Sequence, residues 1–320
     1  MPEPDAHSKP PRRRHSLFWL VGPFVATALL ALAGSVGWWV EKIRLETQLD
    51  HQAQLWRAQG IAMSWTKREV RGFPFRLDLT LSAPRIADRS GWGLAAPRVE
   101  GEAFAYDPGH WIVAAPSGVT LTRPGKGALD IAGQAIRASV SGLGSPAPRW
   151  SFQGIKLTFS PEPGAAPGML SSADLLEAHL QPGPDDQAAL LIRLDSGHSA
   201  GSGAPNNPNE ALALLWDSRL SHMSALTGAD WPSAVKHWTA AGGVMSVVKA
   251  KMTLGAIQLE TRPASLTIGA DGRLQGALPL ALSQGRVART LLGTAPLSLT
   301  FQSGTARLGP LVLGSAFRVF

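Results

Sequence analysis

The residues best suited to catalysis lie in a short glycine-rich stretch, GHSAG at residues 197–201. This stretch is a G-x-S-x-G pattern, in which the serine of a hydrolase sits on a sharp strand-to-helix turn and attacks a carbonyl. Asp217 or Asp230, followed by His237, would complete the hydrolase order of serine, acid and histidine. The pattern also needs a helix directly after the serine, and the residues that follow, SGAPNNPN, disfavour helix initiation. We therefore predict a non-enzymatic protein and keep a serine hydrolase using Ser199 as an alternative.

Residues that bind metals, cofactors or nucleic acids are not clustered in the sequence. The 8 histidines are scattered without H-x-x-x-H or H-E-x-x-H spacing, and there are no cysteines. Neither a P-loop nor a G-x-G-x-x-G pattern occurs, so we expect no metal and no cofactor. The formal net charge of +7 is dispersed and forms no basic patch, so we expect no nucleic-acid binding.

The element that predicts the location of the chain is a charge-free run at residues 17–40, preceded by three arginines at 12–14. As a helix rising about 1.5 Å per residue, this run reaches roughly 36 Å and can cross a hydrocarbon core of about 30 Å. The arginines would remain cytoplasmic, and Trp38 and Trp39 would lie in the interfacial aromatic belt. We predict a single-pass inner-membrane protein with a cytoplasmic tail at 1–16 and its bulk in the periplasm.

A cleaved signal peptide is the alternative reading of the same run. Ala31-Leu32-Ala33 forms an A-x-A site after an apolar stretch, so cleavage after Ala33 stays open. The apolar run continues as far as Val40, which favours an uncleaved transmembrane anchor. Both readings place most of the chain outside the cytoplasm.

The segments after the anchor predict one helix followed by many strands. Residues 41–60 end at Gly60 and are expected to form a juxtamembrane helix. Residues 61–160 alternate between apolar and polar side chains and form the predicted N-terminal β region. A Pro/Gly-rich linker at 161–172 would separate it from a C-terminal β region at 173–320.

Two local patterns refine the predicted C-terminal β region. Residues 210–242 predict a helical insert, because apolar residues recur at helical spacing and Asp230 can cap a second helix. In the sequence SLTIGADGRLQG, a three-residue loop at 270–272 would pair Ile268 with Leu274 on one face of a hairpin.

Residues 71–81, RGFPFRLDLTL, predict the apolar face of the sheet. Phe75, Leu77, Leu79 and Leu81 would share one face because side chains alternate along a strand, and Phe73 lies in the preceding corner. The expected fold is mainly β: an extended, curved antiparallel sheet with a few helices packed on it, preceded by one N-terminal transmembrane helix. The sequence leaves open whether this face lines an open groove or a closed core.

Several short motifs resemble a known family. They are the corner Gly72-Phe73-Pro74-Phe75-Arg76, Trp238 followed by Ala241-Gly242-Gly243, and DGRLQG at 271–276. Together with the anchor and the juxtamembrane helix, they resemble the bacterial domain-of-unknown-function family 2125 over nearly everything after residue 30. The resemblance implies a membrane-anchored protein and lends no catalytic residues. More loosely, the anchored β layout is similar to AsmA-like envelope proteins, which implies a grooved sheet associated with lipid handling, although this chain is much shorter than most of those.

These features together predict a protein that binds lipid or supports cell-envelope maintenance through an apolar β-groove. The expected ligand-binding residues are Phe73, Phe75, Leu77, Leu79 and Leu81. The expected partners are the bilayer, through residues 17–40, and lipids or envelope proteins. The alternative is a structural or assembly partner of an envelope complex, with no small ligand and a wholly internal apolar face. Ligand, partner and oligomeric state are not determined by the sequence.

Overall fold

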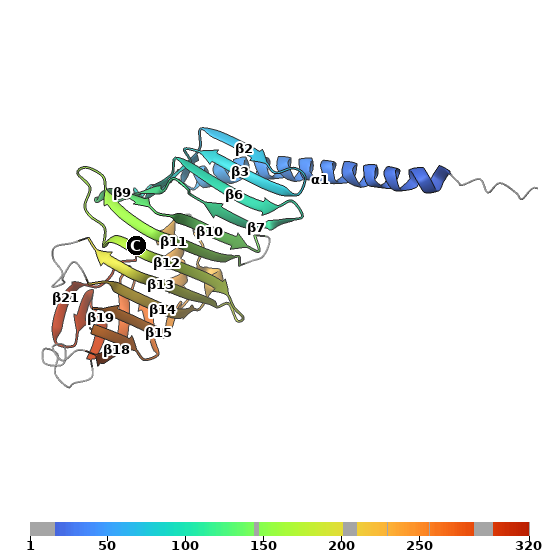
Figure 1. Ribbon diagram of the computed structural model, residues 1–320. Coiled ribbons are helices and arrows are strands. Elements are labelled where there is room, and N and C mark those ends of the chain that lie inside the picture. The colour runs from blue at the N-terminus through green and yellow to red at the C-terminus, as the bar shows by residue number, and fades with distance from the viewer. Residues whose placement is uncertain are drawn as a thin grey trace, which may run out of the picture.

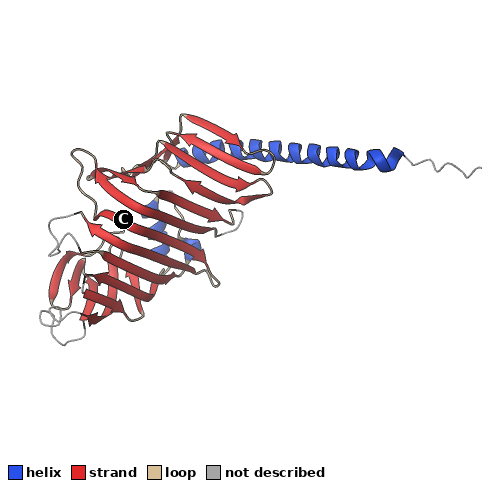
Figure 2. Ribbon diagram, viewed as in Figure 1, coloured by secondary structure: helices blue, strands red, loops and turns tan. Residues whose placement is uncertain are grey.

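A computed structural model describes residues 17–143, 147–200, 210–228, 230–255, 257–284 and 297–319. This part of the chain forms an elongated antiparallel sheet, with α-helices α1 and α2 (Figures 1 and 2). The predicted fold, a mainly antiparallel β protein with an apolar helix before the sheet, is confirmed.

Helix α1 (Leu17–Ala58) is one continuous helix that contains both the predicted anchor and the predicted juxtamembrane helix. From Val21 onward, this helix has the length and the apolar composition needed to cross a membrane. The first part of α1 projects beyond the sheet and its last turns lie against the sheet (Figure 1). The helix ends as predicted near Gly60, which has a φ of +88° and donates its N–H to the carbonyl of Arg57.

The first half of the sheet consists of five strands that are each interrupted once. The pairs of half-strands are β1 (Ala62–Ser64) and β2 (Lys67–Arg71), β3 (Arg76–Ser82) and β4 (Arg85–Ala87), β5 (Gly93–Ala95) and β6 (Arg98–Phe104), β7 (Asp107–Ala114) and β8 (Val119–Arg123), and β9 (Gly127–Ala132) and β10 (Ala135–Ser141). For example, β3 pairs with β6 in the same register in which β4 pairs with β5. Likewise, β9 and β10 pair with successive parts of β11 (Arg149–Pro161) in one register. The interruptions therefore fall side by side on neighbouring strands and form a crease across the sheet.

Proline and glycine account for much of this crease. Pro84 and Pro97 have no N–H to donate to the ladder, and Gly118 adopts a φ of +82° that other residues rarely take. Across the crease, Ala83 donates to the carbonyl of Pro97 and Ala96 to that of Pro84, so the two interruptions bond to each other. A Cβ on Gly118 would lie 2.7 Å from the carbonyl oxygen of Ile131, so this turn also requires glycine for space.

The second half of the sheet continues the meander one strand after another. Its strands are β11, β12 (Leu170–Pro182), β13 (Ala188–Ser199), β14 (Leu212–Leu220), β15 (Met245–Leu254), the interrupted strand β16 (Ile257–Thr261) and β17 (Ala264–Ile268), β18 (Leu274–Gln284), β19 (Leu297–Gln302), β20 (Thr305–Leu308) and β21 (Leu311–Ser315). Ile268 pairs with Leu274 around the loop at 270–272, as predicted.

The Pro/Gly-rich stretch expected to separate two β regions is instead a hairpin loop within one sheet. Strands β11 and β12 flank it and pair from Trp150 and Leu180 to Thr158 and Ser172. The buried side chain of Arg123 at the end of β8 donates to the carbonyls of Ala166 and Pro167, which fastens the loop to the sheet. The prediction of a linker at 161–172 was wrong because Pro and Gly are equally typical of a long turn.

The predicted helical insert at 210–242 is half correct. Helix α2 (Trp231–Ala240) forms, and the Asp230 carboxylate accepts a hydrogen bond of 2.7 Å from the backbone N–H of Ser233. Residues 212–220, however, form strand β14, followed by a 3₁₀ turn at Met223–Ala225. The apolar residues of β14 fit helical spacing and also alternate as Leu212, Leu214 and Trp216, and pairing with β13 and β15 selects the strand.

We expect the N-cap of α2 to make its stability depend on pH. Hydrogen bonds from the Ser233 side chain and backbone lower the pKa of Asp230 below its usual value. The ionised cap therefore stabilises the folded state above the unfolded pKa of about 3.9, and this stabilisation is lost as pH falls through the folded pKa. Hydrogen-exchange protection factors, which correct for the slower intrinsic exchange at low pH, should fall more for the α2 amides than for those of β3. Asp230→Asn, which still accepts a hydrogen bond but does not titrate in this range, should remove the difference.

Candidate functional site

The predicted apolar face of β3 points inward, but α1 covers it. Leu77, Leu79 and Leu81 are 1%, 9% and 6% exposed. They belong to a cluster that also contains Trp38, with Leu45 and Leu49 of α1 packed against it. This part of the apolar face is therefore closed core, which corrects the idea that these leucines line an open groove.

The two phenylalanines predicted with these leucines lie outside that core. Phe73 is 53% exposed and Phe75 is 70% exposed. Residues 72–76 form a tight corner, in which the Arg76 N–H donates to the carbonyl of Gly72 at 2.8 Å. The strand alternation begins only at Arg76, so it does not extend to Phe75. The prediction that Phe75 faces inward was therefore wrong.

The corner is also where α1 meets the sheet. The buried Trp38 donates its indole N–H to the carbonyl of Arg76 at 2.7 Å. Its ring meets that of Phe73 edge to face, with centroids 5.5 Å apart. Further along α1, Asp50 makes a two-point ion pair with Arg68 of β2, with N–O distances of 2.7 and 3.1 Å. These contacts fix the direction in which the apolar helix leaves the sheet.

Beyond α1, the apolar face continues across β11 to β15. One row of directly paired residues runs Phe152, Ala178, Ile192, Trp216 and Ala250, and the next runs Gly154, Leu176, Leu194, Leu214 and Met252. Most of their side chains are half-buried. The packed cluster that contains Leu176, Leu194 and Leu214 draws no member from α1 or α2. We call these two rows the strand apolar face.

The opposite face of the same strands carries a mostly polar row. The row between the two apolar rows on that side runs Gln153, Glu177, Arg193, Leu215 and Lys251. Gln153 donates to Glu177 at 2.8 Å, and Arg193 pairs with Asp195. The single indole of the strand apolar face, Trp216, donates to the hydroxyl of the fully buried Ser218 at 3.0 Å. The row that faces away from the strand apolar face is thus mostly polar.

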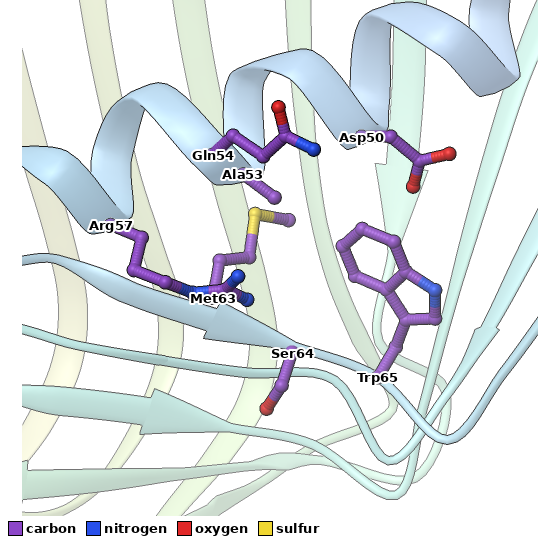
Figure 3. Close-up of a pocket in the computed structure, with 7 residues that line it drawn as sticks. All are labelled: Asp50, Ala53, Gln54, Arg57, Met63, Ser64 and Trp65. Atoms are coloured by element: carbon purple, nitrogen blue, oxygen red, sulfur yellow. The ribbon is translucent and has the colours of Figure 1, made fainter.

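A depression between the end of α1 and β1 is the second candidate site (Figure 3). Met63 of β1 and Trp65, which follows β1, point toward the helix, while Ser64 points away. The helix contributes Asp50, Ala53, Gln54 and Arg57. With a carboxylate, an amide and a guanidinium among its lining groups, this depression is poorly suited to an acyl chain.

The model of DUF2125, described as an uncharacterized protein conserved in bacteria, matches residues 38–295. The chain belongs to the DUF2125 family. The match begins at Trp38, where α1 joins the sheet, and extends past β18, so it includes the corner, the strand apolar face and α2. No curated protein and no solved structure matches this DUF2125 chain, and the looser similarity to AsmA-like proteins is not shown.

The hydrolase residues of this DUF2125 chain are not brought together. Ser199 ends β13, whereas Asp217 pairs with Leu191, eight residues earlier on that strand and therefore about 26 Å away. The Asp230 carboxylate caps α2, and His237 Nδ1 lies 2.6 Å from the carbonyl oxygen of Thr227. Helix α2, which contains His237 and is capped by Asp230, packs near Leu220. Leu220 pairs with Ala188 at the start of β13, whereas Ser199 is at its end, so the acid and the histidine lie away from the serine. Residue 201, the last glycine of the motif, lies outside the described residues.

Metal-binding groups are also dispersed in the part of the DUF2125 chain that the structure describes. No cluster of three His, Asp or Glu residues there could hold a metal ion.

The strand apolar face of this DUF2125 chain was not predicted as a site from the sequence. The alternation of Leu190, Ile192 and Leu194 was visible, but β14 was interpreted as a helix, so the neighbouring row was missed. The alternation of Leu212, Leu214 and Trp216 is the sequence signal that identifies this row.

Proposed function

We propose that this DUF2125 protein is a non-enzymatic, inner-membrane-anchored periplasmic protein that binds lipid acyl chains and supports maintenance of the cell envelope. The observation that carries this proposal is the strand apolar face: two adjacent apolar rows on β11 to β15, mostly half-buried and backed by a mostly polar row. Extended apolar surface of this kind on a chain with a membrane-spanning helix favours an apolar ligand.

The dimensions of the strand apolar face suit an acyl chain. Five neighbouring strands at about 4.8 Å spacing span about 19 Å from β11 to β15. A hydrocarbon core of about 30 Å contains two layers of acyl chains, so one chain reaches about 15 Å. Burial of apolar surface contributes about 25 cal/mol per Å², and an acyl chain on the two rows would remove both its own surface and that of the sheet from water.

The placement in the periplasm rests on the N-terminal sequence. The arginines at 12–14 precede the apolar helix and favour a cytoplasmic N-terminus, which would put the sheet on the other side of the membrane. A lipid-binding sheet in that position would lie beside the periplasmic leaflet of the inner membrane.

Site-specific photocrosslinking would test the ligand. A benzophenone amino acid at Ile192, on the strand apolar face, should crosslink phospholipid in cells, detected as a lipid mass on the purified protein. The matched control is the same amino acid at Arg193, the next residue on β13, which faces the polar side and should yield little lipid. Equal lipid labelling at the two positions would contradict the proposal. Crosslinking at Ile192 to neither lipid nor another protein would favour the assembly-partner alternative, whose apolar face is wholly internal.

A further inference from the structure

Four exposed aromatic side chains gather at one end of the strands. They are Phe73 and Phe75, in the turn between β2 and β3, and Phe104 and Tyr106, at the turn between β6 and β7. Tyr106 is 74% exposed and Phe104 is 51% exposed. We call this group the aromatic rim.

The two turns of the aromatic rim are neighbours in the sheet. Arg76, which follows Phe75, pairs directly with Phe104, and the N–H of Ala105 donates to the carbonyl of Phe75 at 2.9 Å. The rings of Phe104 and Tyr106 are stacked, with centroids 5.0 Å apart. The rim is therefore one continuous surface held by backbone hydrogen bonds, and it is not a set of unrelated exposed residues.

The contacts of Trp38 place the aromatic rim at a defined level along α1. Trp38 donates to the carbonyl of Arg76 and meets the ring of Phe73, so the rim lies beside residue 38 of the helix. The charge-free run of α1 ends at Val40, and Glu41 is the first charged residue after it. The boundary between hydrocarbon and water on this side of a membrane would therefore fall at the level of the rim.

The residues of α1 at this level also have the character of an interface. Trp39 is exposed beside Trp38, and Lys42 Nζ lies 5.8 and 5.0 Å from the ring centroids of Trp38 and Trp39. Tryptophan and tyrosine are favoured at the membrane interface, where an apolar ring and a polar group are both accommodated, and lysine side chains near helix ends extend toward the polar side.

We infer that the aromatic rim inserts into the interface of the same bilayer that α1 spans, so that the protein contacts the membrane at two places. The bilayer surface is the occupant that the geometry favours, because the rim is continuous with the helix that crosses it. The rim would then hold the open ends of β3, β6 and β7 against the lipid headgroups. This inference depends on the membrane anchoring in the proposed function but not on acyl-chain binding by the strand apolar face.

Single-cysteine spin labelling would measure the depth of the rim, since the chain contains no native cysteine. Labels at F75C, F104C and Y106C would be compared in the full chain, reconstituted in nanodiscs of phosphatidylethanolamine and phosphatidylglycerol. Leu29→Cys on α1 is the reference inside the membrane, because Leu29 is 61% exposed and lies near the middle of the charge-free run. Met169→Cys is the reference in water, because Met169 is 87% exposed and precedes β12 at the other end of the strands.

Each label is characterised by the ratio of its accessibility to oxygen, which partitions into the bilayer, to its accessibility to a water-soluble nickel chelate. We expect this ratio to be several-fold higher for the rim labels than for the label at residue 169. Rim labels with the same ratio as residue 169 would overturn the inference. All three rim side chains are exposed, so a folding defect in one variant leaves two others to decide the result. If the rim labels are immersed but Ile192 does not crosslink lipid, acyl-chain binding is rejected and the membrane contact of the rim is retained.

Discussion

Replacing Trp38 with alanine should lower the thermal midpoint of the sheet by roughly 6–20 °C. Truncation of a buried aromatic residue costs about 3–5 kcal/mol, and each kcal/mol shifts the midpoint of a domain of this size by about 2–4 °C. The change removes the hydrogen bond to the Arg76 carbonyl, the edge-to-face contact with Phe73 and part of the cluster over β3. The measurement is the circular dichroism melt of the full chain in nanodiscs at a fixed scan rate.

The matched control is Trp39→Ala. Trp39 is the next residue on α1, is also a tryptophan, and is 54% exposed, against 6% for Trp38. It should change the midpoint much less, because its removal leaves no cavity between helix and sheet. Equal shifts for the two variants would show that the effect comes from the loss of an aromatic residue near the membrane and not from the contact with the sheet.

Leu77→Asp should prevent the sheet from folding. Leu77 is 1% exposed and packs in the hydrophobic cluster with Trp38, so an aspartate there would bury a charge in an apolar core as well as create a cavity. Leu77→Ala, which creates the cavity without the charge, should cost about 2–5 kcal/mol and still fold. The measurement is resistance to limited proteolysis in membranes, together with the yield of protein extracted in a folded state.

Asp78→Ala provides the control on the opposite face of the same strand. The Asp78 carboxylate forms an exposed ion pair with Arg76 at 3.1 Å, and such pairs contribute about 0–1 kcal/mol. Protease resistance of this variant should match that of the original chain. If Leu77→Asp were as resistant as Asp78→Ala, the burial of β3 beneath α1 would be wrong.

The parts of the fold that the sequence predicted well depend on local patterns. Leu77, Leu79 and Leu81 alternate strictly with polar residues, so their common face could be predicted without knowledge of their neighbours. Asp230 before Trp231-Pro232 is a local N-cap pattern, and the structure contains that cap. The loop at 270–272 was predicted because one pairing register kept Ile268 and Leu274 on one face.

The parts that could not be predicted depend on residues distant in the sequence. The crease becomes visible only when the registers of neighbouring strands are known, because Pro84 or Pro97 alone is typical of an ordinary turn. Strand β14 is not predicted because Leu212, Leu215 and Trp216 fit helical spacing while Leu212, Leu214 and Trp216 fit strand spacing. Only pairing with β13 and β15 selects between the two. The covering of β3 by α1 depends on the contact of Trp38 with Arg76, residues 38 positions apart.

The order of the strands has a consequence for how the protein reaches its native state. Once each interrupted pair is counted as one strand, each described strand after the first pairs with the described strand that precedes it in the chain. Each hairpin can therefore add to an existing edge as the polypeptide emerges, without waiting for a distant partner, and such sequence-local pairing favours rapid folding. The earliest strands would assemble beside α1, which then acts as the starting template for vectorial growth of the sheet.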